Sequence, residues 1–406
     1  MSEMTATRLA KGATLVVLAA GWAVAAWLLW QTSVPESLRL PHVDLHDEFS
    51  ASILRRSARY DGFLRWELVI ATLVQLAVLV GLTLLGPRIA RAFELGRVAT
   101  GVMVGAVTTL ALWAVGLPFG AVSLWWGRRY GLEKQSYWEW ALGQWPSLLG
   151  QVVGLTIALT ILLLLAGRFR ERWWLVAGPL FAAIGLVLVL VLPYLETLGT
   201  RPMHKTPLAA EIRQLARKEG VGGTPVRIQS VRDETTAANA MATGIGPSAR
   251  VFIWDTFLDG RFTPAEIKVV AAHEFEHVAA RHIWKGFGWS VLITIPGFFL
   301  VARLTRRRGG MERPEVVPFA LLVLAVFGLA ITPFVNAISR RYEAEADWAA
   351  LRTTRDPASA ESMFKKFTIY DLAQPNPPGW SYVWIDNHPT VAQRIAMARA
   401  WRNQER

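Results

Sequence analysis

Residues 263–277 read TPAEIKVVAAHEFEH, and this stretch predicts a helix that ends in a metal site. Thr263 suits the N-cap position, the proline after it suits the first helical position, and Glu266 completes a capping box three residues after the cap. The apolar residues that follow favour a helix that continues into the motif. We therefore expect His273 and His277 to lie one turn apart on one helical face.

Two imidazoles at this spacing can bind a single zinc ion. Glu274 lies beside the same face, where it can take a proton from a water molecule that the metal activates. Because the chain has no cysteine, any metal site must be built from histidines and carboxylates. The pentapeptide therefore predicts a zinc-dependent hydrolase with one Zn2+ per chain.

A second motif, Glu343-Ala-Glu-Ala-Asp347, follows the last apolar run of the chain. On a helical continuation of that run, Glu343 can complete a two-histidine, one-glutamate site of the gluzincin type, which leaves a fourth position for water. Asp347 lies one turn further on the same face and can orient a ligating imidazole through a hydrogen bond. A solvated acidic helix face is the alternative interpretation, and the two histidines make it the weaker one.

The same pentapeptide also fits an inverted motif, H-x-x-E-H, in which Glu276 is the base. The downstream Glu-x-x-x-Asp arrangement accompanies the forward motif, so we favour Glu274 and expect Glu276 to be a structural or exposed carboxylate. His282 stands five residues beyond His277 and is expected to point away from the metal. The polar stretch 42–48 lacks fixed helical spacing and is interpreted as a loop.

Composition places this site in a membrane protein. The 406 residues are 53% hydrophobic and 18% charged, and the apolar residues form runs long enough to cross a hydrocarbon core of roughly 30 Å. Tryptophans stand at many edges of these runs, as at membrane interfaces. The net charge of +12 fits basic loops beside membrane helices better than a nucleic-acid-binding surface. We expect seven spans: Ala13–Trp30, Glu67–Gly86, Val98–Pro118, Pro146–Ala166, Trp173–Leu195, Gly286–Ala302 and Val316–Ala337.

The runs divide the chain into a membrane domain over 1–195, a first catalytic part over 196–285, a membrane hairpin over 286–337 and a second catalytic part over 338–406. With seven crossings, both catalytic parts emerge on one side of the membrane, and their roughly 160 residues suffice for one domain. The first part is expected to hold a helix at 209–219 and short strands at 226–230 and 251–254. His277 and Glu343 stand at the two ends of the hairpin, which places the metal near the bilayer surface.

Taken together, these features resemble the type I CAAX prenyl proteases, seven-helix integral-membrane zinc endopeptidases related to the bacterial membrane heat-shock proteases. The resemblance covers most of the chain, and the excess of arginine over lysine favours a bacterial member. Besides the two motifs above, it rests on the segments Tyr130–Ser136, Asn239–Gly244, Ile253–Leu258 and His388-Pro389 with Arg394.

The resemblance implies a mainly α membrane protein whose seven transmembrane helices enclose an intramembrane chamber, capped by a zincin-like α+β metalloprotease domain. It also implies that His388 stabilises the oxyanion of the tetrahedral intermediate and that Arg394 supports that region. A substrate peptide would add as a further strand to an edge strand over 250–255. The residues expected to contact this peptide are Asn239, Ala240, Val251 and Ile253.

Two other functions compete with a protease. A transporter or channel with a structural zinc would need polar or broken membrane helices, and the clearest polar insertions are Gln75 and Gln151. A metal-dependent lipid hydrolase has no use for strand addition, because a lipid has no backbone to pair. For a protease, the substrate stays open between prenylated CAAX-type C-termini and hydrophobic or misfolded membrane peptides.

The orientation in the membrane is left open by two conflicting indications. Lysine and arginine counts in the short loops favour a catalytic domain outside the cell. The resemblance implies a domain that faces the cytoplasm, from the plasma (inner) membrane of a bacterium, and we adopt this second orientation. The first run is expected to be an uncleaved anchor, because its apolar stretch continues past the small residues at 23–25.

Overall fold

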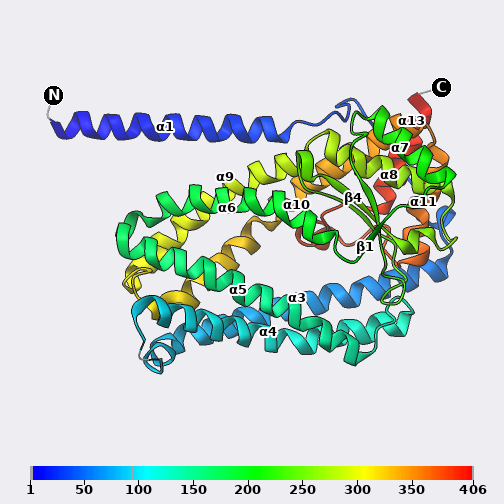
Figure 1. Cartoon of the computed structure of the whole chain (residues 1–406). Coiled ribbons are helices and arrows are strands. Elements are labelled where there is room, and N and C mark those ends of the chain that lie inside the picture. Colours follow the sequence, from blue (N-terminus) through cyan, green and yellow to red (C-terminus); the bar gives the residue numbers. More distant parts are fainter. Residues whose placement is uncertain (1–2, 94, 405–406) are drawn as a thin grey trace.

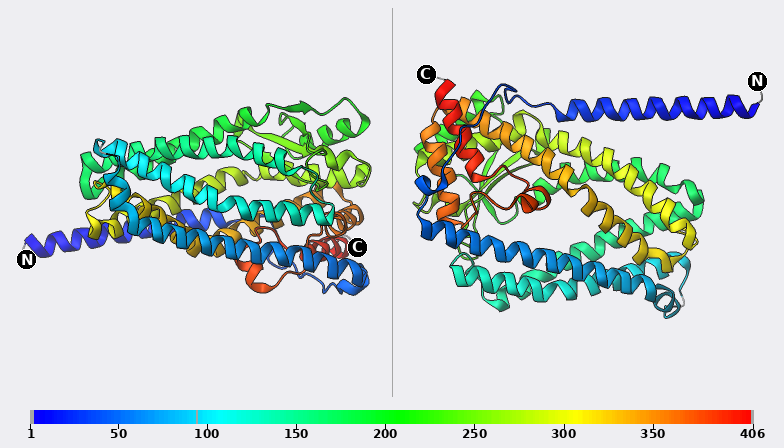
Figure 2. Two further views of the ribbon diagram at one scale, coloured as in Figure 1. Left: turned by 90° about the horizontal axis from the view of Figure 1, so that it is seen from below. Right: turned by 180° about the vertical axis from the view of Figure 1, so that it is seen from behind.

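A bundle of long helices forms one end of the computed structural model, and a small α+β domain forms the other (Figures 1 and 2). The structure describes residues 3–93 and 95–404. The helices of the bundle and its connections are α1 Glu3–Trp30, α2 Leu45–Glu48, α3 Ala51–Arg91, α4 Arg97–Tyr130, α5 Tyr137–Phe169, α6 Trp173–Glu196, α9 His282–Thr305 and α10 Val317–Thr354. The elements of the α+β domain are β1 Thr200–Pro202, α7 Pro207–Lys218, β2 Val226–Gln229, β3 Ala240–Thr243, β4 Arg250–Trp254, α8 Pro264–Ala279, α11 Pro357–Tyr370, α12 Gly379–Trp384 and α13 Val391–Gln404.

Five of the described segments are long and apolar enough to cross a membrane, judged by length and composition. They are Ala51–Arg91, Arg97–Tyr130, Tyr137–Glu196, His282–Arg308 and Pro314–Thr354, and a shorter apolar helix lies at Val16–Trp30. The third segment contains both α5 and α6. The mainly α class with a small sheet is therefore confirmed, while the count of seven spans stays a prediction.

Helix α1 extends away from the other helices, as Figure 1 shows in blue. Its C-terminal part holds it to the molecule: the indole Nε1 of Trp22 donates to the carbonyl of Leu292 in α9 at 3.3 Å. Leu29 and Trp30 pack on a small buried cluster of Trp289, Ile338 and Tyr342. The chain therefore leaves α1 close to the α+β domain.

Helix α10 continues from its apolar run into the α+β domain as one helix of 38 residues. At about 1.5 Å per residue this is roughly 57 Å, which is longer than a hydrocarbon core is thick. Its last part packs against α8, and Glu343 and Asp347 are buried there. The helical extension that the sequence predicts for these two carboxylates is therefore present.

The sheet has the strand order β1-β2-β4-β3. β2 pairs with β1 in antiparallel and with β4 in parallel orientation, and β3 pairs with β4 in antiparallel orientation. Helix α8 packs beside β3. The buried core of the domain lies between this sheet, α7, α8, α11, α13 and the end of α10.

The strand order corrects the prediction of an edge strand over 250–255, because β4 is paired on both sides and β3 is the edge. The backbone N–H of Trp254 donates to Asn239 at 2.9 Å on one side, and the N–H of Val251 donates to Pro225 at 3.0 Å on the other. Val251 and Ile253 are 0% exposed, so neither is free to meet a substrate.

The loop between α4 and α5 joins the helical bundle to the α+β domain. The N–H of Thr236 donates to the backbone carbonyl of Leu132 at 2.8 Å, and the N–H of Lys134 donates to the backbone carbonyl of Glu234 at 2.7 Å. The hydroxyl of Thr235 also donates to Leu132, at 2.9 Å. This contact fixes the segment that immediately precedes β3 relative to the bundle.

Candidate active site

The N-terminus of α8 is held by the capping box that its sequence predicts. The N–H of Glu266 donates to the hydroxyl of Thr263 at 3.3 Å, and the N–H of Thr263 donates back to the Glu266 carboxylate at 2.7 Å. The same carboxylate accepts from Ser362 at 2.6 Å and from Lys366 at 2.7 Å, both in α11. Helix α8 is therefore anchored at Thr263, ten residues before His273 and fourteen before His277.

His273, His277 and Glu343 come together where α8 packs on α10. Among the described residues, these three form the group whose side chains could hold a metal ion, with all ligand atoms within 4.8 Å of one another. The Nε2 atoms of the two histidines are 3.1 Å apart. Oε2 of Glu343 lies 3.1 Å from Nε2 of His273, and Oε1 of Glu343 lies 3.5 Å from Nε2 of His277.

These separations fit zinc. Four ligands placed tetrahedrally at zinc's usual bond lengths of about 2.0–2.1 Å lie roughly 3.3 Å from one another. Two nitrogens and one carboxylate oxygen are also ligands that zinc prefers. A group of three protein ligands leaves a fourth position for water or substrate, which is the arrangement of catalytic rather than structural zinc sites.

Asp347 holds one of the ligating imidazoles. Its carboxylate accepts from Nδ1 of His273 at 2.9 Å, which turns Nε2 of that ring toward the metal group. The guanidinium of Arg394 donates to both oxygens of Asp347, at 2.8 and 2.6 Å. This bidentate pair supplies the opposite charge that a carboxylate buried to this degree requires. Arg394 thus acts through Asp347.

The two acidic residues of the pentapeptide have different surroundings. Glu274 lines a cavity of about 80 Å³ together with Asn239, His273 and His388. Burial raises the pKa of Glu274 to about 7, and a hydrogen bond from the N–H of Ala242 offsets part of this effect. Burial likewise raises the pKa of Glu276 to about 7, and Glu276 does not line that cavity. The positions of the two carboxyls rather than their pKa values therefore distinguish them, and the position of Glu274 favours it as the general base.

Glu219, at the C-terminal end of α7, provides a pH-dependent test of stability. Its carboxylate is buried near the side chain of Thr353, and burial raises its pKa to about 8. Its proton is thus held more tightly in the folded than in the unfolded state, whose carboxyl has a pKa of about 4.3. The stability that the neutral carboxyl contributes is full below pH 4 and is lost as the pH rises to 8.

We expect Glu219→Gln to raise the melting temperature by a few degrees at pH 9 and to leave it nearly unchanged at pH 5, because glutamine stays neutral at both values. Thermal unfolding of both proteins in the same detergent at the two pH values measures this difference. An equal shift at pH 5 and pH 9 would contradict the role assigned to burial.

The free edge of β3 lies beside Glu274. In an antiparallel pair, residues alternate between those whose backbone groups face the partner strand and those whose groups face away. Because Asn239 bonds Trp254 of β4, the backbone groups of Ala240 and Ala242 face the free edge. The N–H of Ala240 donates to the side chain of Asn239 at 2.9 Å. The carbonyls of Ala240 and Ala242 therefore remain to accept from a ligand.

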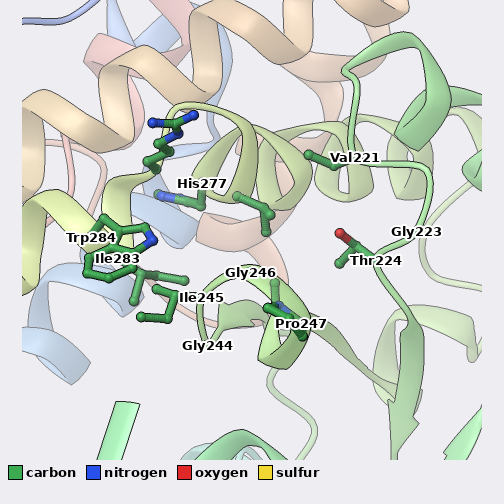
Figure 3. Close-up of a pocket in the computed structure, with 13 residues that line it drawn as sticks. Val221, Gly223, Thr224, Gly244, Ile245, Gly246, Pro247, His277, Ile283 and Trp284 are labelled. Atoms are coloured by element: carbon green, nitrogen blue, oxygen red, sulfur yellow. The ribbon is translucent and has the colours of Figure 1, made fainter. Parts of the chain in front are cut away.

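A pocket lies at each end of β3. The first, of about 520 Å³, is lined by the turn after β3 and by the end of α8 and start of α9. Figure 3 shows His277, Ile283 and Trp284 on one side of it and the turn at Gly244–Pro247 on the other. The second, of about 370 Å³, is lined by Asn239, His388 and residues around them. The candidate metal site lies between the two.

Of the residues predicted from sequence, His388 and Asn239 reach this site. Nε2 of His388 is 3.3 Å from the Glu343 carboxylate, and its side chain is 52% exposed. Both residues line the small cavity beside Glu274. Ala240 lies on the edge strand β3, whereas Val251 and Ile253 lie on β4 and are buried in the core.

His282 does not point away from the site as its spacing suggested. Its Nδ1 lies 2.9 Å from Nδ1 of His277. Helix α8 ends at Ala279, and Arg281 adopts a left-handed conformation with φ of 57°. The chain therefore turns back on itself, and helical spacing does not apply beyond α8.

Comparison with known proteins places these features in context. The profile of peptidase family M48 matches residues 202–402, a range that contains His273, His277 and Glu343 as well as Glu274. The uncharacterized metalloprotease YhfN of Bacillus subtilis (strain 168) is 27% identical over 287 residues, covering 68% of this chain and 67% of that protein. A protease HtpX homolog of Acidiphilium cryptum (strain JF-5) is 27% identical over 285 residues, covering 64% of this chain and 90% of that protein.

The fold as a whole matches a solved structure. The crystal structure of S. mikatae Ste24p superposes with a TM-score of 0.75 and covers 93% of this chain and 96% of that one, at 20% sequence identity. The match extends over the helical bundle as well as the α+β domain. The resemblance drawn from the sequence is confirmed at the level of family and fold.

Proposed function

Because residues 202–402 belong to peptidase family M48, we propose that this protein is an integral-membrane zinc metalloendopeptidase of the gluzincin type. One observation carries the proposal: the group of His273, His277 and Glu343 lies beside Glu274 and the free edge of β3. A structural zinc in a transporter or channel would need neither a base nor an unpaired strand at this place.

Each residue of the site has a separate role in the proposed hydrolysis of a peptide bond. Zn2+ held by His273, His277 and Glu343 would polarise the scissile carbonyl and make a water molecule more acidic. Glu274 takes a proton from this water as the water oxygen bonds to the carbonyl carbon. Glu274 then delivers the proton to the amine nitrogen as the C–N bond breaks. His388 donates a hydrogen bond to the carbonyl oxygen as negative charge develops on it.

An extended peptide would bind along β3 as an additional strand. The carbonyls of Ala240 and Ala242 accept from alternate N–H groups of such a peptide, and its side chains enter the pockets at the two ends of β3. Ile245, Ile283 and Trp284 make the first of these pockets partly apolar. This arrangement supports hydrophobic peptide segments as substrates.

A further cavity within the bundle is compatible with substrates that come from the membrane. It has a volume of about 680 Å³ and is lined by six leucines, three threonines, two glutamines, one alanine and one glycine of α3, α4, α5 and α10. Gln75 and Gln151, the two polar insertions in the apolar runs, both line it. Prenylated C-termini and apolar membrane peptides are both compatible with such a lining.

The proposal is tested with detergent-solubilised protein and a quenched apolar peptide. We expect cleavage that stops when zinc is removed by a chelator and returns when zinc is restored, with products identified by mass spectrometry. A farnesylated peptide and its unmodified counterpart, compared at equal concentration, separate the two substrate classes. Failure of the zinc-loaded protein to cleave any of these peptides would refute the proposal.

Strand addition predicts a periodic response to N-methylation of a substrate peptide. Methylating an amide that donates to Ala240 or Ala242 should raise KM by about 10-fold or more, because a hydrogen bond is lost and the methyl group meets the strand. Methylating the amides between them should have little effect, because they face away from β3. KM values for a series of singly methylated peptides measure this pattern, and a uniform response would contradict pairing with β3.

A further inference from the structure

The second imidazole ligand has a partner of its own. Nδ1 of His277 lies 2.9 Å from Nδ1 of His282, and Nε2 of His282 lies 2.9 Å from the carboxylate of Glu345. Glu345 stands between Glu343 and Asp347 in the sequence, but it reaches the opposite flank of α10, where α9 and the segment after α1 pass.

Hydrogen-bond chemistry assigns the protons along this chain of three side chains. An ionised carboxylate only accepts, so the hydrogen between Glu345 and His282 belongs to Nε2 of His282. The other nitrogen of a neutral imidazole is then an acceptor, and His277 must donate from its Nδ1. This leaves the lone pair of His277 on Nε2, the atom that faces His273 and Glu343 in the metal group.

The surroundings hold Glu345 and His282 in these roles. Glu345 accepts from the N–H of Ser33 at 2.5 Å, and the ammonium of Lys285 lies 3.5 Å away, so donors and positive charge face its carboxylate. His282 is 5% exposed, and its ring stacks on Tyr342 with centroids 4.7 Å apart and planes inclined by 8°. The left-handed Arg281 brings this ring back toward His277. A non-glycine residue in that conformation costs free energy, which the buried contacts of His282 must offset.

We propose that His282 and Glu345 form a relay that fixes the tautomer and orientation of the zinc ligand His277. The inference rests on the proposed function, because it concerns the same metal site. His273 is oriented directly by Asp347, whereas His277 is oriented by Glu345 through His282. The three acidic residues of the motif thus have different roles: Glu343 is a ligand, and Asp347 and Glu345 orient the two histidines. His282 is a positioning residue and makes no contact with the reacting atoms.

The alternative is that His282 only fastens α9 to α10. Zinc affinity distinguishes the two, because fastening alone does not act on the lone pair of His277. His282→Phe keeps the stacking on Tyr342 but removes the acceptor for Nδ1 of His277. We expect it to weaken zinc binding by about 10–100-fold, the usual effect of losing a partner of a ligating histidine. Competition with a chromophoric chelator at fixed pH measures the affinity.

A second variant and a matched control complete the test. Glu345→Gln should also weaken zinc binding, by about 10-fold or more, because an amide can donate to His282 and reverse the tautomer. Tyr342→Phe loses its hydrogen bonds to Leu29 and Trp289 but keeps the stack, so it should lower the melting temperature without changing zinc affinity. The visible spectrum of the Co2+-substituted protein should change in the first two variants and not in the third.

Zinc affinity within twofold of the parent protein in both His282→Phe and Glu345→Gln would overturn the relay. If His282→Phe does not fold, Glu345→Gln decides alone, since it keeps the size of the side chain. A parent protein that binds zinc and cleaves peptide while both variants retain full affinity refutes the relay only. A parent protein that binds no zinc refutes the proposed function itself.

Discussion

Glu274→Gln is expected to lower kcat by roughly 10³-fold while zinc stays bound, because the amide cannot take a proton from water. The substitution keeps the size of the side chain and removes no metal ligand. It also retains an oxygen that can accept from the N–H of Ala242. Zinc content and single-turnover cleavage of an apolar peptide, measured on the same preparation, separate loss of the base from loss of the metal.

Glu276→Gln is the matched control for this experiment. Glu276 is also buried, its pKa is raised to a similar value, and it lies on the same helix, so effects of burial or of α8 stability are shared. We expect its kcat to stay within a few-fold of the parent protein, because it does not line the cavity that Glu274 shares with His388. If Glu276→Gln is inactive and Glu274→Gln is active, the inverted motif is correct.

Glu343→Ala is expected to abolish activity through loss of the metal. Two imidazoles remain, so the affinity for zinc should fall by more than the roughly 10–100-fold that follows loss of an outer hydrogen-bond partner. Asp347→Asn provides that smaller step for comparison, because it weakens the hydrogen bond to His273 without removing a ligand. Chelator competition and metal analysis measure both.

Glu211→Gln serves as the control for this series. This carboxylate is on α7 at the surface, where it pairs with Lys268 at 2.6 Å, and a pair so exposed contributes little to stability. Its zinc affinity and kcat should match the parent protein. Stoichiometric zinc in Glu343→Ala, at a chelator concentration that strips Asp347→Asn, would show that Glu343 is not a ligand.

Local patterns in the sequence were sufficient where the structure is locally determined. The capping box at Thr263 and Glu266 places the start of α8, and helical spacing then brings His273 and His277 to one face. The apolar runs locate the long helices, and the continuation of the last run into α10 brings Glu343 to the histidines. The pattern that predicts each helix lies within a few turns of it, whereas the meeting of Glu343 with the two histidines depends on the packing of α10 against α8.

Strand order and the reversal after α8 were not accessible in this way. β3 and β4 are both short, and the residues of Ala240–Thr243 and Arg250–Trp254 do not indicate which of the two strands pairs with a second strand. The prediction therefore assigned the edge to the wrong strand. The prediction for His282 is wrong because α8 ends at Ala279, and a left-handed arginine has no sequence signature comparable to that of glycine.

Helix α10 carries both an apolar run and the carboxylates of Glu343, Glu345 and Asp347. A change in the tilt of its apolar part therefore moves these carboxylates. Pro333 is a point at which such a helix can bend. A tilt of about 5° there displaces Glu343, which lies roughly 15 Å further along the helix axis, by about 1 Å. Misplacement of that size can cost about 100-fold in rate. A membrane helix can respond to the thickness of the surrounding lipid by tilting, so we expect this thickness to affect the rate of the proposed reaction.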